Sequence, residues 1–260
     1  MKVSTPWKER LKKMSGHSKW ANIKRKKEKT DGAKAKIFTK IGREITVAAR
    51  EGGSDPNNNS RLATLIAKAK ANNVPNDNIE RLLKKASEGK ENYEEITYEG
   101  YGPSGVAVIV ETLSDNRNRT AGDLRHYFDK CGGNLGQSGS VSFLFERRGM
   151  IYIENEDNQI DEEKVMDDAF AAGASDFDYE DGMITIVTEP NDVTKVASAL
   201  EKLGYTYDSA EAEYIPMTKT QITDEELVKK MEKLLDLFDD NDDVQNVYHN
   251  WDMPEEPDED

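Results

Sequence analysis

The sequence predicts an α+β protein with several domains: a basic three-helix N-terminal domain, followed by two α/β domains of the ferredoxin-like type, one inserted in the other. Charge is segregated, because residues 1–50 hold 16 Lys and Arg against 4 Asp and Glu, whereas the whole chain carries a net charge of −15. The hydrophobic period changes near residue 90 from helical to alternating. Only 36% of the 260 residues are hydrophobic, which favours several small cores over one large core.

The N-terminal part divides into an extension, 1–15, and the basic helical domain, 16–91. Apolar spacing predicts helices over 31–50, 61–72 and 77–88. On the first helix, an apolar face is formed by Ile37, Ile41, Ile45 and Ala48. A separate stripe on this helix, which we expect to face solvent, holds the cations Lys36, Lys40, Arg43 and Arg50. Gly52-Gly53 ends the helix, and Ser60 is the predicted N-cap of the next one.

Residues 92–148 and 214–250 are predicted to form one discontinuous α/β domain, because neither part alone has the strands to complete a sheet. The predicted elements are strands 96–101 and 106–113, a helix from about Ala121, strand 214–217, helix 224–238 and strand 244–249. Two pairs with capping-box spacing set the helix starts: Thr120 with Asp123, and Thr223 with Glu226.

Residues 149–213 are predicted to form the inserted domain, with the β-α-β-β-α-β order of ferredoxin-like folds. Its elements, with the strand that leads into it, are strands 143–147 and 150–154 around Gly149, helix 161–172, strands 176–180 and 183–188, helix 191–203 and strand 206–213. Asp181-Gly182 supplies the hairpin turn between the two middle strands. An acidic tail, 251–260, follows the last domain.

Residue types that support catalysis or metal binding are scarce. His17 and His249 are not close to a recognisable nucleophile motif. His126 and Cys131 share a predicted helix but, five residues apart, point in different directions, and Cys131 is predicted to be a small core residue. A single cysteine excludes an internal disulfide and indicates a reducing compartment. The run Asp239–Asp243 lacks the glycine and distal glutamate of a calcium loop, so we expect a solvated helix end there. The sequence therefore predicts a protein without enzymatic activity, metal or cofactor.

The sequence also bears on location and assembly. No apolar run approaches the ~18 residues of a membrane span, and residues 1–13 lack the apolar core of a secretory signal. We therefore expect a cytoplasmic protein that does not bind a membrane. Because no heptad pattern for a dimer is present, we expect a monomer.

The basic N-terminal part gives the main indication of function, since a basic segment on an acidic chain suits a polyanion, most often nucleic acid. The candidate contacts ahead of the first helix are His17, Lys19, Trp20, Lys24, Arg25, Lys26 and Lys27. The four cations of the helix stripe extend this set. Trp20 either stacks on a base or anchors the segment to the protein's own surface. A solvated basic arm is the alternative to nucleic-acid binding.

A second candidate contact is the loop that holds Arg117 and Arg119. Both arginines lie just ahead of the predicted helix start, where free backbone N–H groups and the helix dipole favour an anion. We expect them to contact a nucleic-acid phosphate. The alternative is local pairing of these arginines with Asp115 or Glu111.

Several separated segments of the chain resemble the YebC/PmpR family. They are Gly16–Ile23, Lys36–Lys40, Tyr98–Pro103, Ser114–Thr120, Lys130–Gly136, Gly139–Val141, Asp243–Gln245 and Val247–Asn250. The match covers about residues 14–250 in one register and leaves the first thirteen residues and the acidic tail outside it. The resemblance implies a helical domain and two α/β domains, one inserted in the other, in a cytoplasmic bacterial protein without enzymatic activity.

The resemblance implies two alternative functions. Family members are described as transcriptional regulators that bind DNA, while a mitochondrial relative is a translational activator and bacterial members are linked to the ribosome, where they relieve stalling on proline-rich nascent chains. Helices 61–72 and 77–88 are joined by a short turn and could imitate a helix-turn-helix. The cations of the second helix, Arg81, Lys84 and Lys85, however, suit phosphate contacts, which orient a protein on nucleic acid but do not read its sequence. We therefore expect nucleic acid as the partner, double-stranded DNA or ribosomal RNA. Physical grounds slightly favour RNA or the ribosome, and a protein-binding adaptor is a third alternative.

Overall fold

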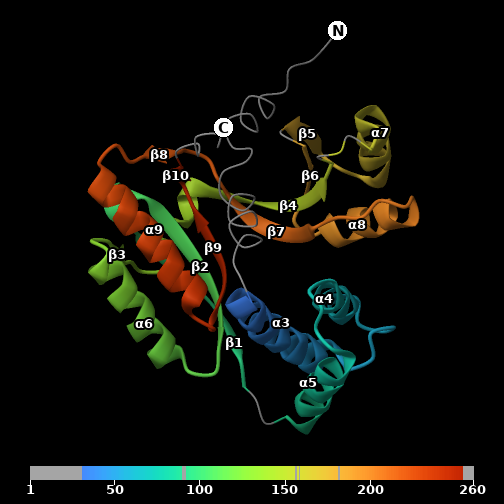
Figure 1. The fold of residues 1–260 in the computed structure, drawn as a ribbon, viewed down its shortest axis with the longest axis horizontal. Coiled ribbons are helices and arrows are strands. Elements are labelled where there is room, and N and C mark those ends of the chain that lie inside the picture. The colour runs from blue at the N-terminus through green and yellow to red at the C-terminus, as the bar shows by residue number, and fades with distance from the viewer. Residues whose placement is uncertain (1–30, 90–91, 156, 158, 181, 254–260) are drawn as a thin grey trace. The chain divides into compact units, whose positions relative to one another are not determined.

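The structure, a computed structural model, describes residues 31–89, 92–155, 157, 159–180 and 182–253 (Figure 1). Its described residues form two compact units: a larger unit, made of 31–141 together with 220–251, and an inserted unit, made of 142–219 together with 252–253. Helices at the start of the chain are followed by mixed helices and antiparallel sheets, which confirms the predicted α+β class.

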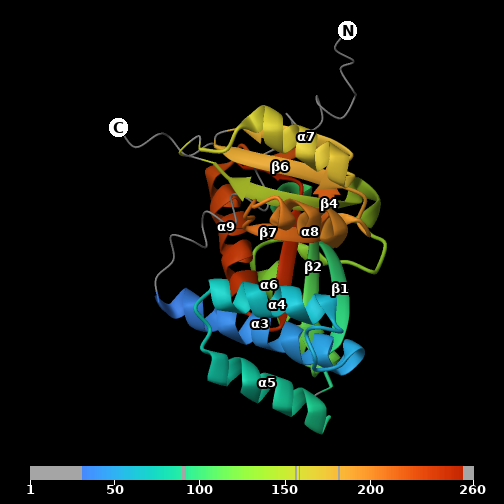
Figure 2. The same ribbon diagram turned by 90° about the vertical axis from the view of Figure 1, so that its right-hand side faces the viewer.

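The described part of the larger unit begins with three helices. They are α3 (Asp31–Gly52), α4 (Ser60–Ala71) and α5 (Asn76–Glu88). Helix α3 lies between the other two and packs against both (Figure 2). Its Ile41, Ile45 and Ala48 are buried, as the periodicity predicts, against Leu62 of α4 and Ile79 of α5. The helices are therefore held by an apolar stripe on each, which leaves their charged faces for other contacts.

The turn between α3 and α4 is organised by Asn59, not by the predicted Ser60. The Asn59 side-chain oxygen accepts a hydrogen bond from the Leu62 amide at 3.0 Å, which makes Asn59 the N-cap of α4. Its side-chain nitrogen donates to the carbonyls of Ala48 and Gly53, both at 2.8 Å. An amide can satisfy both helix ends at once, which the serine hydroxyl could not do as well.

A four-stranded antiparallel sheet forms the centre of the larger unit, in the order β3-β1-β2-β9. Its strands are β1 (Glu94–Tyr101), β2 (Ala107–Ser114), β3 (Asn134–Leu135) and β9 (Val244–His249), and the 3-10 turn η1 (Pro103–Gly105) joins β1 to β2. Strand β9 pairs with β2, with Tyr248 opposite Ile109. Strand β9 therefore completes a sheet whose first strand begins about 150 residues earlier. A separate pair is formed by β8 (Thr220–Gln221) and β10 (Trp251–Asp252).

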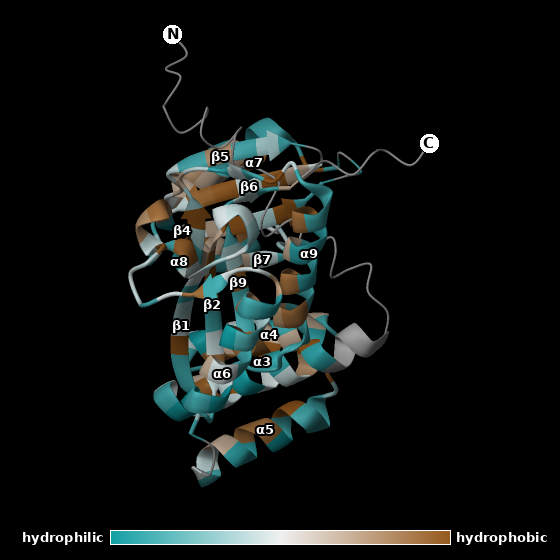
Figure 3. Ribbon diagram, turned by 90° about the vertical axis from the view of Figure 1, so that its left-hand side faces the viewer, coloured by the Kyte–Doolittle hydropathy of each residue, from teal (hydrophilic) through white to brown (hydrophobic). Residues whose placement is uncertain are grey.

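Two helices, α6 (Arg117–Lys130) and α9 (Glu225–Asp240), lie side by side on one face of this sheet (Figure 1). Phe128 of α6 meets Phe238 of α9 edge to face, with ring centroids 5.3 Å apart. Hydrophobic residues recur along α9 and α5 between hydrophilic ones (Figure 3), as expected for helices that bury one face. Cys131 at the end of α6 is fully buried, which confirms its predicted place in the core.

The N-caps of α6 and α9 are not the residues that the capping boxes predict, and α6 also begins earlier than predicted. Asn116 is the N-cap of α6 and accepts from the Arg119 amide at 3.1 Å, so the helix begins at Arg117 and not near Ala121. Asp224, not Thr223, caps α9. In α6 the hydroxyl of Thr120 is directed elsewhere, to a buried carboxylate described below, which explains why its spacing misled the prediction.

The inserted unit has the predicted β-α-β-β-α-β order. Its elements are the 3-10 turn η2 (Ser142–Leu144), β4 (Phe145–Glu154), α7 (Glu162–Ala172), β5 (Asp176–Glu180), β6 (Met183–Thr188), α8 (Val193–Lys202) and β7 (Ser209–Pro216). The sheet is antiparallel, in the order β5-β6-β4-β7. Residues from both helices share one core with Ile151 and Ile184. This arrangement matches the ferredoxin-like pattern that the sequence predicts.

Strand β4 is continuous through Gly149, where two separate strands were predicted. Strand β7 likewise runs from Ser209 to Pro216, so it joins the later part of the predicted strand 206–213 to most of the predicted strand 214–217. The predicted domain boundaries at 148/149 and 213/214 therefore fall inside two paired strands. Glycine at position 149 reflects close packing, not a strand end: a Cβ there would lie 2.1 Å from Thr188 Oγ1 and 2.8 Å from Val193 Cβ.

We predict that Gly149→Ala lowers the free energy of unfolding by about 1–3 kcal/mol, because the added methyl group overlaps β6 and the start of α8. Urea denaturation followed by circular dichroism measures this. Gly122→Ala is the matched control: position 122 is inside α6 and has open space around it, so this change should be neutral or stabilise by up to about 1 kcal/mol. Equal effects of the two substitutions would contradict the packing argument.

Candidate nucleic-acid interface

The predicted contacts fall into two groups. Seven of them lie outside the described residues: His17, Lys19, Trp20, Lys24, Arg25, Lys26 and Lys27. The other six lie in the larger unit, four on α3 (Lys36, Lys40, Arg43 and Arg50) and two in the first turn of α6 (Arg117 and Arg119). Only this second group has a described geometry.

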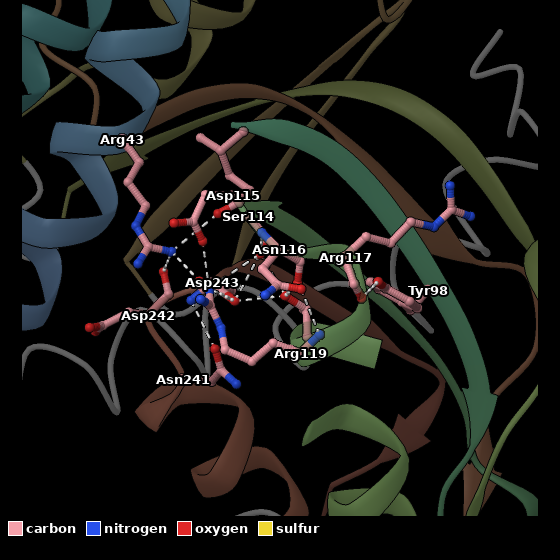
Figure 4. A network of polar contacts seen from close by, with 12 residues as sticks. Arg43, Tyr98, Ser114, Asp115, Asn116, Arg117, Arg119, Asn241, Asp242 and Asp243 are labelled. Carbon is pink, nitrogen blue, oxygen red and sulfur yellow. Dashed lines mark hydrogen bonds and ion pairs between the residues drawn. The ribbon is translucent and has the colours of Figure 1, made fainter. Parts of the chain in front are cut away.

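The side chain of Asp243, between α9 and β9, is the centre to which this group converges (Figure 4). Arg43 Nη1 donates to its Oδ1 at 2.5 Å, and Arg119 Nη2 donates to its Oδ2 at 2.8 Å. The hydroxyls of Thr120 and Ser114 donate to Oδ2 at 2.7 and 3.0 Å. One carboxylate thus binds groups from α3, the end of β2 and α6.

The charge of this carboxylate is stabilised by its donors. Burial alone would raise the pKa of Asp243, but the hydrogen bonds from Arg119, Thr120, Arg43 and Ser114 outweigh burial and lower this pKa from 3.8 to about 2. The hydrogen bonds that Arg119 donates to Asp243 and to Asp115 in turn raise the pKa of Arg119. Both partners therefore stay ionised throughout the physiological pH range.

Arg43 is not the solvent-facing residue that the α3 stripe predicts. Its guanidinium also donates to the carbonyls of Leu113 at 3.1 Å and Asp242 at 2.8 Å, and lies 5.3 Å from the ring centre of Tyr93. Only 16% of its side chain is exposed. Arg43 therefore joins the helical part of the larger unit to its sheet.

The neighbouring cations of α3 also meet oxygen atoms of the protein. Lys36 Nζ lies 2.6 Å from Asp240 Oδ1, and Lys40 Nζ donates to the Asp239 carbonyl at 3.3 Å. Arg50 is exposed and donates to the Tyr93 carbonyl at 3.0 Å. The prediction that the run Asp239–Asp243 is a solvated helix end is therefore wrong in part. The run contacts the basic face of α3, and its last carboxylate, that of Asp243, is buried.

The two arginines of α6 differ from each other. Arg119 pairs with Asp115 at 2.8 Å, the local alternative, and with Asp243, which the sequence did not indicate. Arg117 is exposed and its side chain points away from the cluster (Figure 4). Its backbone carbonyl accepts from Tyr98 at 3.2 Å, and among the described residues no ion pair or hydrogen bond of its side chain is found. Arg117 therefore is the cation of this pair that can reach a ligand.

Two further findings concern the chemistry of the described residues. No group of three or more His, Cys, Asp or Glu among them is placed to hold a metal ion. Burial raises the pKa of the Cys131 thiol, against the opposing effect of Lys233, Lys130 and Lys230, so it is not a reactive thiolate. Within the same described part of the chain, none of the helices has both the length and the apolarity to cross a membrane.

We predict a specific loss of stability in acid. A carboxylate with a lowered pKa stabilises the fold above its unfolded pKa, near 4, and this contribution disappears as the pH falls toward 2. Between pH 6 and pH 2 the wild type should lose about 2 kcal/mol more than Asp243→Asn. Urea denaturation of both proteins across this range measures the difference. Parallel curves would show that Asp243 is not the stabilised group.

The chain matches family models over most of its length. Residues 18–89 match the TACO1/YebC protein N-terminal domain, and residues 93–251 match the TACO1/YebC second and third domain. A relative from Ruminiclostridium cellulolyticum is 58% identical and covers 95% of this chain and all of its own length. One from Acetivibrio thermocellus is 56% identical, over 92% of this chain and 99% of its own. Both relatives are named probable transcriptional regulatory proteins.

A solved structure has the same fold. The crystal structure of a conserved hypothetical protein from Aquifex aeolicus is 44% identical, with a TM-score of 0.80, and covers 89% of this chain and 96% of its own. These matches confirm the resemblance read from the separated sequence motifs. The chain belongs to the TACO1/YebC family.

Proposed function

We propose that this protein is a non-enzymatic regulator of gene expression that binds nucleic acid through its basic N-terminal part, as a monomer in the cytoplasm. The observation that carries the proposal is the charge segregation: 16 Lys and Arg against 4 Asp and Glu in residues 1–50 of a chain with net charge −15. The relatives' names support the regulatory role. The exposed side chain of Arg117, in the first turn of α6, would add a second point of contact outside the N-terminal helices.

The relatives' names favour DNA as the target, in transcriptional regulation. The helix best placed to read bases by analogy with a helix-turn-helix would be α5, which follows α4 after a short turn. Its sequence, however, holds three acidic residues, Asp77, Glu80 and Glu88, as well as Arg81, Lys84 and Lys85. Arg81 is also bonded to its own helix, at the Asp77 carbonyl and the Asn78 side chain. Helix α5 as a whole thus carries no net positive charge for contacts with the phosphates that flank a groove.

This property of α5 favours a second candidate function, binding to structured RNA in translation. RNA recognition of this kind depends on shape and backbone contacts, for which dispersed cations suffice. The corresponding role would be that of a ribosome-associated factor, as in the relief of stalling on proline-rich nascent chains. The two candidates differ in target, and both use the basic N-terminal part.

We predict that crosslinking in cells, followed by sequencing of the bound nucleic acid, recovers fragments of one target class. Ribosomal RNA crosslinks with co-sedimentation in sucrose gradients would identify the translation role and exclude operator binding. Discrete promoter peaks without ribosome association would identify the transcription role. Recovery of neither above a control lacking residues 16–30 would contradict the proposed function.

We predict that Arg117→Ala weakens nucleic-acid binding several-fold and reduces the salt slope of log K by about 0.9, as expected for one lost phosphate contact. Fluorescence anisotropy with duplex DNA and with a structured RNA, at several salt concentrations, measures both quantities. Lys195→Ala is the control, since Lys195 is exposed on α8 and its loss changes the net charge equally. Equal effects of the two substitutions would contradict a specific contact at Arg117.

A further inference from the structure

The acidic end of α9 covers the face of α3 to which a polyanion would bind. Three cations, spaced by four and three residues on that face, each meet oxygen atoms of the Asp239–Asp243 run. Lys36 pairs with the Asp240 carboxylate, Lys40 with the Asp239 carbonyl, and Arg43 with Asp243 and the Asp242 carbonyl. A row of negatively charged and carbonyl oxygens thus lies along a row of cations, as a phosphate backbone would.

These carboxylates lie at the end of a helix where they are unfavourable for the helix itself. The C-terminal end of a helix carries a partial negative charge, so cations stabilise it and anions do not. Helix α9 ends at Asp240 with no basic residue in its last turn, and Asp239 and Asp240 occupy that turn. The arrangement therefore has no local explanation in helix stability. The contacts of this end with the cations of α3 offset that cost.

Exposure differs along this contact. At the inner end Arg43 and Asp243 have side chains that are 16% and 5% exposed, and the pair is fixed by several further hydrogen bonds. At the outer end the side chains of Lys36 and Asp240 are 42% and 65% exposed. Exposed ion pairs are weak and sensitive to salt. A competing anion can therefore take the place of Asp240 beside Lys36 while Arg43 remains paired with Asp243.

We propose that Lys36 and Lys40 form a nucleic-acid contact that the acidic end of α9 masks, and that a nucleic-acid backbone displaces the Asp240 carboxylate from Lys36 and the Asp239 backbone carbonyl from Lys40 while Arg43 stays bound to Asp243. This inference rests on the proposed function. The partner is defined by its chemistry, a row of phosphates, which DNA and RNA share. Binding then exchanges the aspartate oxygens for phosphates. The end of α9 therefore lowers the affinity for nucleic acid and disfavours polyanions that bind weakly.

A double-mutant cycle with Lys36→Gln and Asp240→Asn tests the exchange. The probes are a duplex DNA fragment and a fragment of ribosomal RNA, each measured by fluorescence anisotropy over a range of salt. We expect Asp240→Asn to raise affinity by up to about five-fold, the equivalent of one exposed ion pair of about 1 kcal/mol, and to steepen the salt slope by about 0.9. Lys36→Gln should have little effect in the wild type and should abolish the gain in Asp240→Asn.

Glu232→Gln provides the matched control. Glu232 is exposed on α9 about two turns before Asp240, and its substitution removes the same charge as Asp240→Asn. In that background Lys36→Gln should act as it does in the wild type. If the wild type binds nucleic acid and Lys36→Gln lowers affinity equally in all backgrounds, the masking is wrong and the proposed function stands. If neither the wild type nor Asp240→Asn binds either probe, both the masking and the proposed function are wrong.

Discussion

The larger unit depends on one buried carboxylate, that of Asp243. A buried charge without partners costs several kcal/mol, so it is compatible with a stable fold only where charged and hydroxyl donors meet it together. Here two arginines and two hydroxyls do so, and they come from α3, from the end of β2 and from the first turns of α6. The positions of these three elements are therefore coupled, since displacement of any one would leave the others facing an unsatisfied charge.

Strand pairing brings this carboxylate to its donors. The register of β9 on β2 places Val244 opposite Thr112, and the Leu113 amide donates to the Asp243 carbonyl at 2.7 Å. Ser114, at the end of β2, is then adjacent to Asp243 although 129 residues separate them in the sequence. The C-terminal segment thus both completes the sheet and supplies the group that binds Arg43. The contact of Arg43 with the sheet part of the unit therefore depends on the pairing of β9 with β2.

The sequence predicts the local part of this arrangement well and the long-range part poorly. Periodicity correctly places Ile41 and Ile45 on the buried face of α3, because burial of an apolar stripe is a property of one helix. The same periodicity puts Arg43 on a separate stripe but contains no information on what covers that stripe. The caps fail for a related reason: the Thr120 hydroxyl has the spacing of an N-cap, yet it binds a carboxylate 123 residues away. Gly149 was read as a break because close packing against Val193 leaves no local signature.

Net charge in a sequence therefore overstates the charge that a partner meets. The six described cations predicted to bind nucleic acid differ in what they meet. Arg43 is mostly buried in an ion pair, and Lys36 and Arg119 are in ion pairs with partly exposed side chains. Lys40 and Arg50 donate to backbone carbonyls, and Arg117 extends into solvent. Affinity for a polyanion depends on how many cations can release counterions and reach phosphate. A buried pair contributes nothing to that number, whereas a pair as exposed as Lys36 with Asp240 contributes according to how readily its own anion is displaced. In the nucleic-acid contact that we propose, the carboxylates of the acidic remainder would compete with phosphates for the same cations, as Asp240 does for Lys36.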